Sequence, residues 1–178
     1  MSLKHVILSA LSEQSLSGYS ITKEFDLVLG NFWHASHQQV YRQLGRMADE
    51  GLVSFSLERQ SDRPDRKVYS LTEAGTEVLE RWFAEPTPMA ATKSVLLAKL
   101  YACDDPETVL SQVVRFRDDC RAALDEFDRI AGRYYPEPVA KMEDWKKRAY
   151  LTLRYGISQR KAQLAWAMEA EQIIRDMG

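Results

Sequence analysis

Apolar side chains recur every three or four positions along much of the first 85 residues, which is the spacing of one helical face. This pattern predicts a helix over residues 3–11, a second over residues 19–29 and a third over residues 36–50. A polar turn over residues 13–18 separates the first helix from the second. Gly30 and Gly51 stand where the second and third helices are expected to end, because glycine stops helices readily.

The pattern then changes to a period of two. Residues 53–58 alternate apolar and polar side chains, which predicts a half-buried strand. Residues 60–65 are polar and contain proline, as in a turn, and residues 67–71 supply the returning strand of a hairpin. Thr72 is a good cap for a fourth helix. Residues 85–89, which contain two prolines, are the best candidate linker in the chain.

Everything after the linker is predicted to be helical. Residues 93–102 form a short apolar helix, and Asp105 followed by Pro106 is a strong signal for the start of the next. Residues 132–138 interrupt that helix, and residues 139–177 form the last one. The chain therefore divides at the linker into residues 1–85 and residues 86–178.

The last predicted helix is about 55 Å long, which is too long to bury its apolar face against one short partner helix. Packing against a second copy of the chain would cover that face, so we expect a homodimer. A kink near Gly156 within one compact bundle is the alternative. The residues expected in the dimer contact are Leu151, Ile157, Leu164, Trp166, Met168 and Ile173.

Composition sets limits on the function. The chain has a net charge of −2, and its first 85 residues carry nine Lys and Arg against twelve Asp and Glu, so bulk charge does not favour nucleic acid. Two cysteines and three histidines lack the spacing of metal ligands, and we expect buried thiols with no metal or cofactor. No membrane-spanning run or signal pattern is present, which favours a cytoplasmic protein.

The order of three helices, two strands and a helix is that of a winged helix-turn-helix, which places its third helix in the major groove of DNA. Ser36 and Gln39 have the spacing of a capping box at the start of that helix. Val40, Leu44 and Met47 share its inner face. The outer face, the second helix and the arginine-rich hairpin supply the candidate DNA contacts. These are Tyr19, Ser20, Ser36, His37, Gln38, Gln39, Tyr41, Arg42, Arg46, Arg59, Arg63, Arg66 and Lys67.

Several segments, in this order, are similar to those of the PadR family of bacterial transcriptional regulators. They lie at residues 3–8, 17–21, 32–36, 40–44, 50–53 and 67–75. Residues 151–157 and 164–166 resemble the longer branch of the family, whose C-terminal helical domain is related to a virulence-gene activator. One departure is Arg42, which stands where family members often have proline, so the family's base contacts are not transferred to it.

The resemblance implies a mainly α fold, with a winged helix-turn-helix over residues 1–85 and a helical dimerisation domain over residues 86–178. It also implies a homodimer on an inverted-repeat operator. Family members are often repressors, and some respond to small aromatic molecules, whereas the activator relative works with a partner protein. Candidate side chains for such an effector are Trp145, Tyr150, Arg154, Tyr155 and Trp166.

An enzyme and a protein-binding adaptor are the alternatives to a DNA-binding regulator. An enzyme is disfavoured, because the chain has no glycine-rich phosphate loop and no nucleophile elbow. A winged-helix adaptor that binds protein instead of DNA stays open, since the net charge is slightly acidic. Steep salt dependence of DNA binding would separate a regulator from an adaptor.

Overall fold

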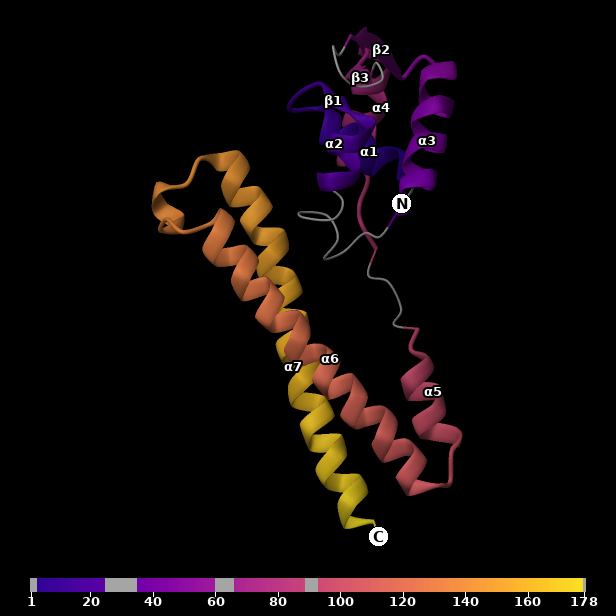
Figure 1. The fold of residues 1–178 in the computed structure, drawn as a ribbon, viewed down its shortest axis with the longest axis vertical. Coiled ribbons are helices and arrows are strands. Elements are labelled where there is room, and N and C mark those ends of the chain that lie inside the picture. Colours follow the sequence, from indigo (N-terminus) through magenta and orange to yellow (C-terminus); the bar gives the residue numbers. More distant parts are fainter. Residues whose placement is uncertain (1–2, 25–34, 60–65, 89–92, 178) are drawn as a thin grey trace. The chain divides into compact units, whose positions relative to one another are not determined.

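The computed structural model describes residues 3–24, 35–59, 66–88 and 93–177. The chain forms two compact units, Met1–Met89 and Ala90–Gly178, and it is mainly helical with one small sheet in the first unit (Figure 1). The expected fold class is confirmed. The predicted division at residue 85 lies close to the boundary between the units. That the first unit binds DNA and the second forms the dimer stays a prediction.

The first unit contains α1 (Leu3–Leu11), α2 (Gly18–Glu24), α3 (His37–Asp49) and α4 (Glu73–Ala84). Helix α1 has the predicted bounds, and Thr72 caps α4 by accepting a hydrogen bond from the Gly75 amide, as predicted. The second half of the predicted helix 19–29 lies outside the described residues. The four helices and the sheet enclose one core, whose fully buried side chains are Ile7, Leu8, Ile21, Val40, Leu44 and Met47.

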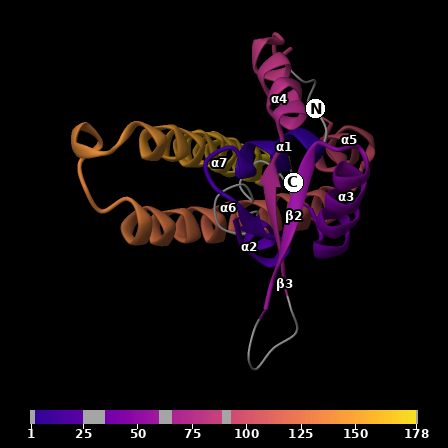
Figure 2. The same ribbon diagram turned by 90° about the horizontal axis from the view of Figure 1, so that it is seen from above.

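The sheet has three antiparallel strands in the order β1-β3-β2, one more than the sequence predicted. Strand β1 (Leu16–Ser17) lies within residues 13–18, for which the sequence predicts a polar turn. Two residues are too few to show alternation, so only the pairing of Leu16 with Tyr69 reveals the strand. Strands β2 (Val53–Glu58) and β3 (Arg66–Leu71) form the predicted hairpin (Figure 2).

The predicted half-burial of β2 is wrong beyond its first residue. Val53 is buried, whereas Phe55 is 44% exposed and Leu57 is 61% exposed. Figure 2 shows β2 and β3 extending together beyond the helices of the unit, so the outer part of the hairpin has no helix to cover it. The alternation of side chains was correct, but burial depends on what lies against the strand.

The second unit contains α5 (Val95–Ala102), α6 (Pro106–Tyr134), the short 3₁₀ helix η2 (Val139–Lys141) and α7 (Asp144–Asp176). Asp105 caps α6 with Pro106 in its first turn, as predicted. Two predicted boundaries were wrong. Helix α6 continues through Gly132 to Tyr134, because a glycine inside a helix is unfavourable but does not by itself end it. Helix α7 begins only at Asp144, because residues 139–141 form the separate helix η2.

Helices α6 and α7 lie side by side as a long hairpin (Figure 1). The expected "short partner" is wrong: α6 has 29 residues against 33 in α7, so much of the α7 apolar face is buried inside the chain. Gly156 is buried within a continuous α7. Two apolar clusters hold the hairpin, one around Val113 and Ala167 and the other around Phe127 and Leu153.

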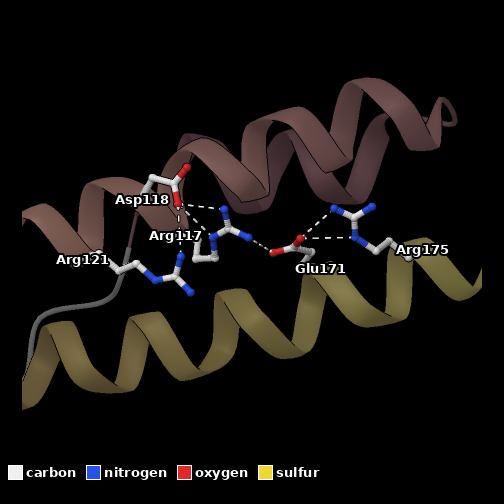
Figure 3. Close-up of polar contacts among 5 residues, drawn as sticks. All are labelled: Arg117, Asp118, Arg121, Glu171 and Arg175. Atoms are coloured by element: carbon white, nitrogen blue, oxygen red, sulfur yellow. Dashed lines mark hydrogen bonds and ion pairs between the residues drawn. The ribbon is translucent and has the colours of Figure 1, made fainter.

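An ion-pair network adds polar specificity to this hairpin. Arg117 of α6 pairs with Glu171 of α7 and with its neighbour Asp118, and Glu171 also accepts from Arg175 (Figure 3). Hydrogen bonds from Arg175 and Arg117 lower the pKa of Glu171, and bonds to Asp118 and Glu171 raise that of Arg117. Arg117 and Glu171 are mostly shielded from solvent, so sliding one helix past the other would break the one pair that joins the two helices and leave each charge with only its partner on its own helix.

The cysteines are free thiols, Cys120 buried and Cys103 half-buried, and burial raises the pKa of Cys120. Over the described ranges, no helix combines the length and the apolar character that a bilayer crossing requires.

Gly75 allows the first turn of α4 to pack closely against the backbone just before β2. A Cβ built on Gly75 would lie 2.1 Å from the carbonyl oxygen of Leu52, which is far inside van der Waals contact. The same carbonyl accepts a hydrogen bond from the Thr72 amide, and the Thr72 hydroxyl donates to the Gly51 carbonyl, so the backbone there is held on both sides.

We therefore expect Gly75→Ala to destabilise the first unit by about 3 kcal/mol, because the backbone must shift to accept a methyl group. Chemical denaturation monitored by circular dichroism measures the change. Gly132→Ala is the matched control: its Cβ would meet no atom within 4 Å, so it should stabilise α6 by roughly 0.5–1 kcal/mol. Equal stability of Gly75→Ala and wild type would contradict the close contact.

Candidate nucleic-acid interface

Helix α3 is fixed at its N-terminus by the capping box that the sequence predicted. The Ser36 hydroxyl accepts a hydrogen bond from the Gln39 amide at 3.3 Å, and the Ser36 amide donates to Gln39 Oε1 at 2.8 Å. Val40, Leu44 and Met47 are fully buried on the inner face. At the other end, Gly51 adopts a φ of 71°, a conformation that suits glycine after a helix.

The outer face of α3 presents polar side chains to solvent. Gln38, Arg42 and Arg46 are exposed, and none of their side chains forms a hydrogen bond or an ion pair with another residue that the structure describes. Glutamine can pair with adenine through two hydrogen bonds, and arginine can do so with guanine. These three side chains are therefore available to contact base edges.

Gln39 differs from Gln38, although the sequence grouped them together. Its side-chain oxygen is occupied by the Ser36 amide in the capping box, so bidentate pairing with a base would require the cap to open. His37 is exposed at the first turn of the helix, where a phosphate would be favoured. Capping and base contact thus fall to different residues of the same turn.

Tyr41 connects α3 to the rest of the unit and is half-exposed. A Cβ on Gly18 would lie 2.5 Å from Tyr41 Cε1, so the ring packs directly on the start of α2. Tyr41 also lies near Tyr69 of β3. Burial, with a smaller contribution from the Tyr41 hydroxyl, raises the pKa of Tyr69. Tyr41 is thus as much a packing residue as a candidate contact.

The candidate contacts at the start of α2 are unequal. Tyr19 is 59% exposed, with Lys23 Nζ 5.6 Å from its ring centroid. The Ser20 hydroxyl is half-buried and is hydrogen-bonded to the Ser17 hydroxyl at 2.9 Å. Tyr19 is open to a ligand, whereas Ser20 already has a partner.

The hairpin carries less free positive charge than its sequence suggests. Arg66 Nε donates to Glu58 Oε2 at 2.6 Å, which raises the pKa of Arg66 and lowers that of Glu58. Lys67 Nζ lies 4.1 Å from the centroid of the Phe55 ring. Arg59 is exposed, and Arg63 lies outside the described residues. The pairing of Glu58 with Arg66 across the strands follows from their register, which the sequence did not settle.

The residues expected in a dimer contact divide into two groups. Leu151, Met168 and Ile173 are at least half exposed. Ile157 is instead buried in the hairpin core with Phe127 and Leu153, so its inclusion is corrected. Leu164 is half-buried, as is Trp166, whose ring lies edge-on to Phe116.

The five candidate effector residues all lie on α7. Trp145 and Tyr155 are exposed, as is Arg154, and Tyr150 packs on Tyr135. Trp145 and Trp166 stand about six turns apart, roughly 30 Å along one helix. One chain therefore cannot gather all five around one small molecule.

Comparison with known proteins agrees with this geometry. The model of the transcriptional regulator PadR-like family matches residues 7–81, and that of the virulence activator alpha C-terminal domain matches residues 92–175. A probable transcriptional regulator of Mycobacterium tuberculosis, Rv1176c, is 32% identical over 99% of both chains.

Two solved structures are similar over nearly the whole chain. The Vibrio cholerae virulence activator AphA is 37% identical, with a TM-score of 0.87 over 99% of this chain and 100% of that one. Bacillus subtilis PadR in complex with operator DNA is 27% identical, with a TM-score of 0.83 over 97% and 98% of the two chains.

The B. subtilis protein, a negative transcriptional regulator, is 38% identical over 56% of this chain and 55% of its own length. Its structure with p-coumaric acid has a TM-score of 0.78, at 26% identity over 97% and 98% of the chains. The relatives are regulators and not enzymes. The chain belongs to the PadR-like family of transcriptional regulators and has a virulence-activator-like C-terminal region.

Proposed function

We propose that this regulator binds a specific DNA sequence as a homodimer, reads it with the outer face of α3, and represses transcription. The observation that carries the proposal is the state of that face. Gln38, Arg42 and Arg46 are exposed and, within the described ranges, unengaged, while the buried inner face and the capping box hold their helix rigidly. Side chains with no structural task in the chain are free for a ligand, and their chemistry suits base edges.

Local placement of charge compensates for the acidic total. Arg42 and Arg46 lie on the outer face of α3, whereas Glu50 at its C-terminal end pairs with Lys4 at 3.7 Å. Arg59 is exposed on the hairpin and has no ion-pair partner among the described residues. A few well-placed arginines support specific contact, and binding to DNA should weaken as the salt concentration rises.

The exposed side of α7 supports the dimer. At about 100° per residue, Leu151, Tyr155, Ala162 and Ile173 point into one sector of roughly 40°, which also contains the acidic Glu169, opposite the face packed on α6. Leu151 is 65% exposed and Tyr155 is 63% exposed. Helix α5 is apolar yet has no buried residue, and Tyr101 on it is 95% exposed. A second copy would cover these surfaces and place two α3 helices about 34 Å apart on one face of DNA.

Repression is proposed because the B. subtilis relative is a negative regulator and its structure includes operator DNA. The V. cholerae relative is an activator, so activation with a partner protein is the alternative outcome. A reporter driven by the bound promoter distinguishes the two. Expression should rise when the regulator is deleted, and a fall on deletion would assign activation.

DNA reading by α3 is tested by fluorescence anisotropy with a duplex that the wild-type protein selects from random-sequence DNA. Arg46→Ala should weaken binding to that duplex by about 1–3 kcal/mol and leave binding to random duplexes nearly unchanged, because a lost base contact affects only the specific complex.

Arg129→Ala is the matched control, since Arg129 is an exposed arginine of α6 that, in the part of the chain that the structure describes, pairs with Glu126 alone. Its binding should equal that of wild type. Equal losses for Arg46→Ala on selected and random DNA would contradict base reading, and failure of the wild type to select any sequence would favour the protein-binding adaptor.

The dimer is tested by sedimentation velocity with the double variant Leu151→Glu/Ile173→Glu. We expect a monomer with wild-type helix content, because both side chains point away from the hairpin core. Affinity for the selected duplex should fall by at least about tenfold, since one half-site is lost. Val139→Glu, a 47% exposed apolar residue of η2, should remain dimeric. A persistent dimer in the double variant would place the contact elsewhere.

A small aromatic effector is proposed on the support of the B. subtilis protein, whose structure contains p-coumaric acid. Since the candidate residues spread along α7, a shared cavity would need side chains from both copies, with Trp145 and Arg154 of one copy near Trp166 of the other. Thermal unfolding with p-coumaric acid provides the test. We expect stabilisation of about 2.7 kcal/mol at a hundredfold excess over Kd. Trp145→Ala should abolish it and Tyr134→Ala should not; no shift in wild type would remove this ligand.

A further inference from the structure

Gly45 stands in the middle of α3 and has no structural reason to be glycine. It is exposed, and a Cβ built on it would meet no atom within 4 Å. Its φ is helical, because Gly51 is the only described glycine with a positive φ. Glycine is among the poorest helix formers and alanine is the best, so this residue weakens the helix without a gain in packing.

The other glycines that the structure describes in the first unit have a reason within the chain. Gly75 lies against the Leu52 carbonyl, Gly18 lies beneath the Tyr41 ring, and Gly51 has the positive φ that ends α3. Gly45 differs from all three, and any advantage it gives must involve something outside the chain.

The position of Gly45 indicates what that is. It follows Arg42 by three residues and Gln38 by seven, and precedes Asp49 by four, so it lies with them on the outer face of α3. Arg46 flanks it. The bare backbone therefore lies beside Gln38, Arg42 and Arg46, the side chains proposed to contact bases, with the acidic Asp49 on its C-terminal side.

Groove dimensions make a bare position useful. The major groove is about 12 Å wide, and a helix with its side chains measures about 10–12 Å, so the helix fills the groove with little room to spare. Without a side chain at its centre, α3 can sit deeper. We propose that Gly45 is the point of closest approach between α3 and the DNA, and that it sets the depth at which Gln38, Arg42 and Arg46 reach base edges. Gly45 is thus a positioning residue. This inference rests on the proposed DNA binding.

Two pairs of variants test it. Gly45→Ala and Gly45→Leu keep or improve helix propensity while adding volume to the outer face. Gly132→Ala and Gly132→Leu are the matched controls, because Gly132 is also exposed, helical and surrounded by open space, but lies in α6. Each full-length variant is measured for unfolding free energy and for binding to the duplex selected by wild type and to random duplexes.

We expect all four variants to be at least as stable as wild type. Gly45→Ala should weaken binding to the selected duplex by about tenfold, Gly45→Leu by about a hundredfold, and binding to random duplexes should change less than about threefold. The Gly132 variants should bind like wild type. A loss that grows with volume while stability rises cannot come from damage to the fold.

Unchanged or tighter binding by Gly45→Ala would overturn the inference, and it would leave the proposed function intact if wild type still selects a sequence. Tighter binding would show that glycine only loosens α3. If wild type selects no sequence at all, the proposed function and this inference both fall.

Discussion

The burial of Val40, Leu44 and Met47 against the core of the first unit is the contact on which the candidate interface depends. Because these three side chains are fully enclosed, α3 cannot rotate about its axis without exposing them to water, at a cost of several kcal/mol. The orientation of the opposite face follows directly. Gln38, Arg42 and Arg46 need no restraints of their own, since the helix that bears them is held from behind.

The residues around α3 have different roles in holding the helix. Ser36 and Gln39 satisfy each other's backbone amides and fix the start of the helix. Tyr41 packs on Gly18, which ties α3 to α2. Gln38, Arg42 and Arg46, whose side chains have no partner within the described ranges, lie together on one surface around Gly45. The backbone of this surface is held in place before any ligand binds, so binding would cost mainly the rotamer entropy of the exposed side chains.

In the second unit, α7 carries large apolar side chains on a buried and on an exposed face, whereas the buried side chains of α3 all lie on its inner face. Helix α7 buries one face on α6, where Arg117 and Glu171 pair across the hairpin, and leaves Leu151, Tyr155 and Ile173 exposed on the other side. A single hairpin cannot cover both faces of one helix. The exposed apolar side chains are thus a consequence of the architecture. In the proposed homodimer a second copy would cover them, since most homodimers form by two-fold contact of one surface with itself.

The sequence by itself determined most of the elements and the face of α3 that meets solvent, because helical periodicity, caps and turn residues are local properties. Ser36, Thr72 and Asp105 cap the helices they were expected to cap. Tertiary structure alone decided the contacts between distant segments. It paired Leu16 with Tyr69 as a third strand, matched Glu58 with Arg66, supplied a long partner for α7 and buried Ile157 within the chain. Such features depend on register and on neighbours, and one segment's pattern contains no information about what lies against it.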